Sequence, residues 1–238
     1  MRKLIAAAIV AASASACGQG HAQDAGPDTS RNYQVGNFQQ IEVAGPYDVE
    51  VRTGANVGVS ARGSEKLLEH TLVEVQGDKL VIRPQQHNSW FGFSTRGHAN
   101  LTVTVPQLRG AAIAGSGSIN VDRVQGPSFA GSVGGSGNLN VAAMDVQSLK
   151  VDIGGSGSVK AGSGKAQTAE YSIGGSGNVD AGAITSQDLK VSIAGSGGVR
   201  ANATGTADVS MMGSGDVQIG GGAKCKVSKM GSGDVRCS

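Results

Sequence analysis

A Gly-Ser-Gly triplet recurs at a nearly fixed interval through the second half of the chain. Its seven copies begin at Gly115, Gly135, Gly155, Gly175, Gly195, Gly213 and Gly231, so four intervals of 20 residues are followed by two of 18. A flexible linker has no reason to keep such a period, whereas stacked structural units require it. The repeat therefore limits the chain to architectures built from equal units that share their core with their neighbours.

Apolar residues occupy every second position on both sides of each triplet, as in LKVDIGGSGSVKA (149–161). This alternation is typical of a strand with one buried face. One unit of this length cannot bury its own apolar face, so the sequence predicts an all-β fold. Residues 109–238 are expected to form a right-handed parallel β-helix, or β-solenoid, whose coils advance by about 4.8 Å each. A meandering antiparallel sheet is the alternative architecture.

The triplet glycines are expected at the corners of the coils, where the backbone needs a positive φ or a close approach to its neighbour. These corner residues are Gly115, Gly117, Gly135, Gly137, Gly155, Gly157, Gly175, Gly177, Gly195, Gly197, Gly213, Gly215, Gly231 and Gly233. The serines between them, from Ser116 to Ser232, would then stack as a ladder.

Residues 33–108 hold most of the aromatic side chains and no triplet. Strand-like alternation recurs there in QIEVAG, YDVEVRTG, VGVSARG, KLVIRP and NLTVTVP. The pattern predicts a β-rich N-terminal part that caps or begins the solenoid. The stretch SEKLLEHTL (64–72) predicts one short helical turn.

The first residues, MRKLIAAAIVAASASAC, are typical of a signal peptide: two cations precede an apolar run too short to span a membrane. Cleavage after residue 16 would leave Cys17 as a lipidated N-terminus, which anchors the protein to a membrane. Gly18 after the cysteine favours the outer membrane. An ordinary signal peptidase cut after Ala22 is the alternative. Residues 17–32 are small and polar, as expected of a flexible tether.

The last coil contains Cys225 and Cys237, both at inward positions of the repeat. In an oxidising envelope a disulfide between them would close a short loop and stabilise the fold by about 3 kcal/mol. Two free buried thiols are the alternative. Lys229 replaces an interior aliphatic residue in the same coil, as expected of a terminal cap that faces water.

Three stretches carry a resemblance to a known family: FQQIEVAGPYDVEVRTG (38–54), KLVIRP (79–84) and LTVTVPQLRGAAIAGSGSINV (101–121). Together they resemble the auto-transporter adhesin head domain family, also called the head GIN domain, over residues 35–238. The resemblance implies an exported bacterial β-helix-like domain, often found on lipoproteins. It brings no binding residues, and true autotransport through a translocating barrel is not expected from this sequence.

Composition and motifs argue against several function classes. Without Arg2 and Lys3 of the signal peptide, 18 basic side chains face 18 acidic ones, so no nucleic-acid partner is expected. The glycines form neither a dinucleotide-binding nor a P-loop motif, and no nucleophile elbow occurs. Apolar residues occupy the aspartate position of calcium-binding glycine repeats. We therefore predict no catalytic residue, no metal site and no cofactor.

Trp90, Phe91 and Phe93 lie within the polar loop QQHNSWFGFSTRGH (85–98). Large aromatics among polar residues are typical of a partner-binding anchor. They would equally serve to cover the open end of the solenoid core, and both interpretations stay open.

The sequence as a whole predicts a non-enzymatic structural or adhesive module of the cell envelope, presented on a lipid-anchored tether. The alternative is a periplasmic module that binds or senses an envelope glycan or protein through residues 85–98. A homo-oligomer stays open, and an enzyme is the least favoured class.

Overall fold

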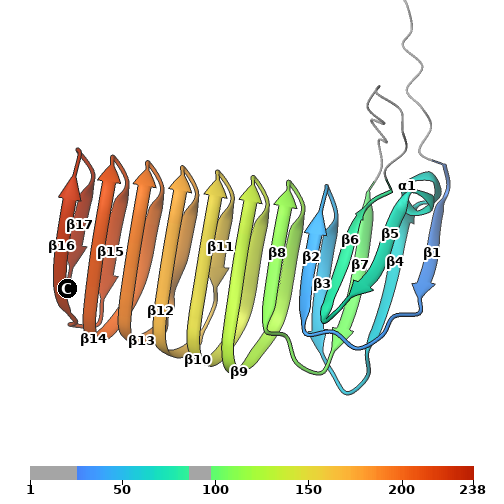
Figure 1. Cartoon of the computed structure of the whole chain (residues 1–238), viewed down its shortest axis with the longest axis horizontal. Helices are drawn as coiled ribbons and strands as arrows, with labels where there is room; N and C mark the ends of the chain where they lie inside the picture. Colours follow the sequence, from blue (N-terminus) through green and yellow to red (C-terminus); the bar gives the residue numbers. More distant parts are fainter. Residues whose placement is uncertain (1–25, 86–97) are drawn as a thin grey trace, which may run out of the picture.

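The chain folds into a rod of stacked coils, and the coils follow one another along its long axis from the N-terminal cap to the C-terminus (Figure 1). The computed structural model describes residues 26–85 and 98–238. Each coil has two faces, and in the coils from residue 110 onward a Gly-Ser-Gly triplet joins them at one edge. We call them the pre-triplet face and the post-triplet face, according to which side of the triplet their residues lie in sequence.

The strands divide between these two faces. The pre-triplet face contains β5 (Thr71–Gln76), β6 (Lys79–Pro84), β2 (Gln40–Ala44), β8 (Gly110–Gly115) and β16 (Lys224–Met230). The post-triplet face contains β1 (Asp28–Tyr33), β4 (Gly58–Ser64), β7 (Ala99–Val105), β3 (Asp48–Thr53), β11 (Ser158–Ala161), β15 (Asp216–Gly220) and β17 (Asp234–Cys237). Long strands bend from one face to the other at the edge opposite the triplets: β9 (Ser118–Gly135), β10 (Asn138–Gly155), β13 (Asn178–Gly195) and β14 (Gly198–Gly213), with β12 (Gly164–Gly175) beginning at that bend.

Neighbouring coils pair in parallel, which confirms the predicted β-solenoid and contradicts the antiparallel meander. Between β9 and β10 each residue faces the one 20 positions later, for example Ile119 and Leu139. The interval shortens at one place. In the β13–β14 pair the register slips between Ala181 and Thr185 and again, in the opposite sense, between Ser186 and Asp188, at the edge opposite the triplets. The coils therefore lose two residues at that edge while the triplet edge stays constant.

The triplet corners explain why two glycines flank the serine. Gly135, the first glycine of its triplet, has a φ of 118°, and the equivalent glycine of each other triplet also has a positive φ. Gly137, the third, has an ordinary φ, but a Cβ there would lie 2.6 Å from the Gly117 carbonyl oxygen of the previous coil. One glycine thus supplies a backbone conformation and the other a close approach.

Inside the rod, one hydrophobic core runs without interruption from Phe38 to Ile219. Inward side chains of both faces contribute, because alternation along each strand places every second residue in the interior. The N-terminal part shares this core, so residues 33–108 form the beginning of the same solenoid.

The order of the first coils in space differs from their order in sequence. Strand β2 pairs in parallel with both β6 and β8, and β3 pairs with both β7 and β9. The coil made by β6 and β7 therefore lies outside the earlier coil made by β2 and β3. The chain moves outward after β3 and returns after β7, so segments 54–57 and 106–109 both pass the edge opposite the triplets.

Antiparallel strands and a helix close the N-terminal end. Strand β4 pairs antiparallel with β7 and with β1, and β5 pairs antiparallel with β6. The short helix expected within residues 64–72 is α1 (Glu65–Glu69), and its Leu67 and Leu68 are buried against the end of the core.

Two expectations for this end need correction. The tether predicted over residues 17–32 is wrong for residues 28–32, which form part of β1 and pair with β4. The mostly polar residues DTSRNY form a strand here because the free edge of β4 supplies hydrogen-bond partners for their backbone. Strand β5 was not predicted. Its residues overlap the stretch that signalled a helix. In the described residues no helix is long and apolar enough to cross a membrane.

Candidate functional site

The outer surface of the post-triplet face carries two columns of polar side chains. The residues one position after each triplet form the first polar column: Ser118, Asn138, Ser158, Asn178, Gly198, Asp216 and Asp234. The residues three positions after form the second polar column: Asn120, Asn140, Lys160, Asp180, Arg200, Gln218 and Arg236. Between them lies a column of buried aliphatic residues such as Val179 and Val199, so strand alternation turns both polar columns outward.

Hydrogen bonds between coils hold these side chains in place. Asn140 Nδ2 donates to Asn120 Oδ1 over 2.8 Å, and Ser158 Oγ donates to Asn138 Oδ1 over 2.6 Å. Asn178 Oδ1 accepts a bond of 3.1 Å from the backbone N–H of Gly198. The parallel register repeats such contacts up the column, so the polar groups form an ordered array before any ligand arrives.

A depression of about 410 Å³ interrupts this surface over the C-terminal coils. It surrounds Gly198, the one residue of the first polar column that has no side chain. Its polar lining comes from both columns: Asn178, Asp180, Arg200, Asp216, Gln218, Asp234 and Arg236. The depression therefore combines amide, carboxylate and guanidinium groups around a patch of exposed backbone.

The charged groups of the depression are held loosely. Arg200 and Asp180 are 3.9 Å apart, and Arg236 and Asp234 are 3.5 Å apart. All four side chains are largely exposed, and such ion pairs contribute only about 0–1 kcal/mol. Their donors and acceptors are thus available to hydroxyl or amide groups of a ligand at little cost.

Two other depressions have less to offer a ligand. One, of about 280 Å³, lies on the pre-triplet face over side chains of alternating sign, among them Lys150, Glu170, Lys190 and Asp208. Lys190 Nζ already contacts Glu170 Oε1 at 3.1 Å. The other, of about 330 Å³, lies where segments 54–57 and 106–109 pass each other.

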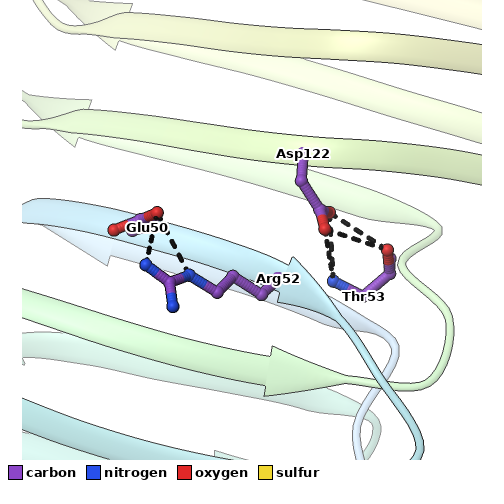
Figure 2. A network of polar contacts seen from close by, with 4 residues as sticks. All are labelled: Glu50, Arg52, Thr53 and Asp122. Atoms are coloured by element: carbon purple, nitrogen blue, oxygen red, sulfur yellow. Dashed lines mark hydrogen bonds and ion pairs between the residues drawn. The ribbon is translucent and has the colours of Figure 1, made fainter.

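The carboxylate of Asp122 joins two strands at the edge where segments 54–57 and 106–109 pass. Both carboxylate oxygens of Asp122 accept hydrogen bonds from the backbone N–H and the hydroxyl of Thr53, over 3.0–3.2 Å (Figure 2). The backbone N–H of Arg123 donates to the same carboxylate over 2.6 Å. Asp122 thus joins the end of β3 to β9 where the ladder between them has stopped. Glu50 and Arg52 also contact each other nearby, but both lie on β3.

We expect Asp122→Ala to lower the free energy of unfolding by about 1–2 kcal/mol, because it removes charge-assisted hydrogen bonds to a backbone N–H. Glu50→Ala is the matched control and should change it by less than about 1 kcal/mol, since it breaks only an exposed ion pair. Urea unfolding followed by circular dichroism measures both. Equal effects of the two substitutions would contradict a structural role for Asp122.

The other predicted site residues fall into two groups. Cys17, Trp90, Phe91 and Phe93 lie outside the described residues, so the lipid anchor and the aromatic loop stay predictions. Cys225 and Cys237 are joined in a disulfide across the last coil, with their Cα atoms 6.6 Å apart. Lys229 folds back in the same coil, and its Nζ donates to the Gly233 carbonyl oxygen over 2.7 Å.

Sequence analysis missed the depression around Gly198. One signal was present. The residue after the triplet is serine, asparagine or aspartate in all six of the other coils, and it is glycine only at position 198. A missing side chain in a polar column predicts a local hollow.

The side chains with raised pKa values lie away from the depression. Burial raises the pKa of Tyr171 far above its ordinary value, and burial is also the main cause of the raised pKa of Tyr47. Both tyrosines stay protonated at physiological pH and act as core residues. Residues 26–85 and 98–238 contain no group of three or more His, Cys, Asp or Glu side chains placed to hold a metal ion.

Comparisons with known proteins agree with the fold. The family model described as "Putative auto-transporter adhesin, head GIN domain" matches residues 37–223. No curated protein matches the sequence.

Several solved structures share the architecture. A crystal structure described as a putative adhesin from Bacteroides fragilis has a TM-score of 0.79 at 23% identity, covering 89% of this chain and 97% of that one. A protein from Parabacteroides distasonis described as a putative lipid binding protein has a TM-score of 0.68 at 21% identity, covering 90% and 97%. A putative adhesin from Parabacteroides merdae has a TM-score of 0.67 at 17% identity, with coverage of 90% and 97%. At these identities the likeness establishes the fold alone.

Proposed function

Because this chain belongs to the auto-transporter adhesin head GIN domain family, we propose that it is a non-enzymatic adhesive module of the bacterial cell envelope that binds a glycan on its post-triplet face. Family membership indicates an adhesive or structural role and an exported protein. The observation that supports a glycan ligand is the depression around Gly198, lined by amide, carboxylate and guanidinium groups.

The chemistry of the depression favours a neutral, hydroxyl-rich ligand. A sugar ring offers several hydroxyl groups, each both a donor and an acceptor, and these match carboxylate oxygens, amide groups and guanidinium N–H groups. Asp180, Asp216 and Asp234 outnumber Arg200 and Arg236, so the lining gives no preference for an anionic polymer. The two polar columns continue from the depression along the rod. A linear glycan would therefore find further polar partners beyond the first sugar.

Presentation on the envelope completes the proposal. Lipidation of Cys17 would hold the protein on a bilayer, and the outer membrane is the proposed location. Residues 18–27 would then form the tether, since the folded part begins with β1 at Asp28. The rod carries the depression at the end opposite β1, so a ligand at some distance from the membrane is the natural target (Figure 1).

We expect Arg200→Ala combined with Asp216→Ala to reduce binding to purified envelope glycans at least about tenfold, the effect of losing about 1.4 kcal/mol of contacts. The measurement is a glycan array with the mature protein, followed by isothermal titration of the strongest ligand. Lys150→Ala is the control, because Lys150 lies on the pre-triplet face, away from both polar columns. Unfolding midpoints should stay close to those of the unsubstituted protein.

The alternative function predicts a different outcome from the same assay. If the aromatic loop binds the ligand, replacing Trp90, Phe91 and Phe93 with serine abolishes binding, while the Arg200 and Asp216 substitutions leave it intact. That result would reject the depression as the binding site. Binding of no glycan by the unsubstituted protein would reject the proposal altogether.

A further inference from the structure

In the last coil, β16 on the pre-triplet face and β17 on the post-triplet face each pair with another described strand on one side only. Strand β16 pairs with β14 on one side, and none of the described strands pairs with its other side. The N–H and C=O groups along a free strand edge are a template for an additional strand. Such edges are used by proteins that bind an extended peptide by strand addition.

Exposed apolar side chains collect at this same edge. Among the described residues, the large hydrophobic side chains that are exposed are Met212, Val227 and Met230, at 61%, 46% and 68%. Val227 occupies an inward position, and its register partner Val209 is buried. Val227 is therefore a core position that lacks the next coil. Met230 lies beside Met212 on the outer surface, at the triplet end of the strand.

The edge strand is also strongly basic. Lys224, Lys226 and Lys229 all lie on β16, which contains no acidic residue. In the described residues no carboxylate lies within ion-pair distance of Lys224 or Lys226. Some lysines of earlier coils differ: Lys150 pairs with Asp152, and Lys190 pairs with Glu170. What distinguishes β16 is that it carries three lysines and no acidic residue on one strand, with Asp208 of β14 opposite Lys226 in the register.

These charges determine which strand the edge accepts. Like charges directly opposite each other on paired strands are destabilising, and opposite charges are stabilising. A second copy of β16 paired in parallel and in register would place lysine against lysine, so this form of self-pairing is disfavoured. A strand with acidic residues opposite Lys224 and Lys226 would be attracted by the same side chains.

The edge is held ready for a partner. The disulfide ties β16 through Cys225 to β17 through Cys237, so the strand cannot fray away from the end of the rod. Lys229 is folded back onto the Gly233 carbonyl oxygen, which holds its side chain in one place. A partner therefore loses little affinity to ordering of the site.

We propose that the free edge of β16 binds an extended acidic polypeptide segment by strand addition, with acidic residues facing Lys224 and Lys226 and an apolar residue covering Val227. This partner is distinct from the proposed glycan, which lies on the post-triplet face. The solenoid would therefore join a glycan ligand and an acidic protein segment through two separate surfaces.

The test uses the full mature protein and two fluorescent heptapeptides, one alternating glutamate and valine and the other alternating lysine and valine. We expect the acidic peptide to bind at least tenfold more tightly than the basic one by fluorescence anisotropy. Lys224→Glu combined with Lys226→Glu should reverse this preference. Lys150→Glu combined with Lys190→Glu makes the same change in net charge on earlier coils and should leave it unchanged. Lys224→Gln with Lys226→Gln is the milder variant if the reversed charges impair folding.

Amide hydrogen exchange distinguishes strand addition from simple charge attraction, since only strand addition should protect the backbone of β16. Equal affinity for the two peptides, equal loss in the control variant, or no protection of β16 would each overturn the proposal. Binding to phosphatidylglycerol vesicles that depends on Lys224 and Lys226, without binding of the acidic peptide, would instead assign the edge to an anionic membrane. Glycan binding should be unaffected by all of these lysine substitutions.

Discussion

Gly135→Ala is expected to lower the free energy of unfolding by about 3 kcal/mol. Gly135 has a φ of 118°, which residues with a Cβ adopt only under strain. The new Cβ would also lie 2.6 Å from the Gly115 carbonyl oxygen, the acceptor for the N–H of Ser136. Relief of that overlap would have to separate two coils at their corner. The strain and the weakened inter-coil hydrogen bond act together.

The neighbouring residue provides a matched control. Gly134 does not have a positive φ, and a Cβ there would meet its nearest atom, the Ile113 carbonyl oxygen, at 3.6 Å. Ala114 faces Gly134 in the neighbouring coil, so the position already accepts a methyl group. Gly134→Ala should therefore change stability by less than about 0.5 kcal/mol. Urea unfolding of both variants measures the difference. Similar midpoints for the two would contradict the role assigned to the first triplet glycine.

The period of the sequence was enough to predict the solenoid, because equal spacing and strand alternation leave few other ways to share a core. Position within the triplet carried more information than the prediction used. The same residue type serves two needs, φ at Gly135 and close approach at Gly137. The glycine pattern in the sequence does not show which of these two needs each glycine meets. The position of the backbone in the adjacent coil shows it.

The features that sequence did not predict all depend on contacts between distant segments. Strand β1 forms because the edge of β4 is free to pair with it. The sequence DTSRNY has no alternation of apolar residues that would predict a strand. After β3 the chain moves toward the N-terminal end of the rod before it returns at β8. The local sequence does not predict this change of order, because β2 and β6 each have an ordinary strand pattern. The depression at Gly198 exists only because parallel register places Asn178 and Asp216 on either side of that residue.

Inward side chains at the same register differ in size from coil to coil, although the coils have the same shape. In two coils the two central inward positions of the pre-triplet face hold a leucine and a valine, Leu149 with Val151 and Leu189 with Val191. The coil that precedes Leu149 has Phe129 and Gly131 at the same register. A Cβ at Gly131 would meet Leu139 Cδ2 at 2.8 Å, with Phe129 Cε1 at 3.7 Å. The small residue thus leaves room that the large ring and Leu139 occupy.

A double-mutant cycle tests this compensation. Gly131→Val alone should destabilise the fold by about 1–3 kcal/mol through overpacking, and Phe129→Leu alone by about 1 kcal/mol through lost contacts. Combined, they recreate the leucine and valine of the next coil. We therefore expect the double variant to be more stable than the sum of the single effects by at least about 1 kcal/mol, measured by urea unfolding.

A distant pair gives the control for this cycle. Val191 lies three coils further along, about 14 Å away at one strand spacing per coil. Gly131→Val with Val191→Ala should be additive within about 0.5 kcal/mol. Additivity of the Phe129 and Gly131 substitutions as well would mean that the ring and the glycine do not share one space. Coupling confined to Phe129 and Gly131 would show that each coil balances its own volume, which keeps the coils of the rod in register despite their different residues.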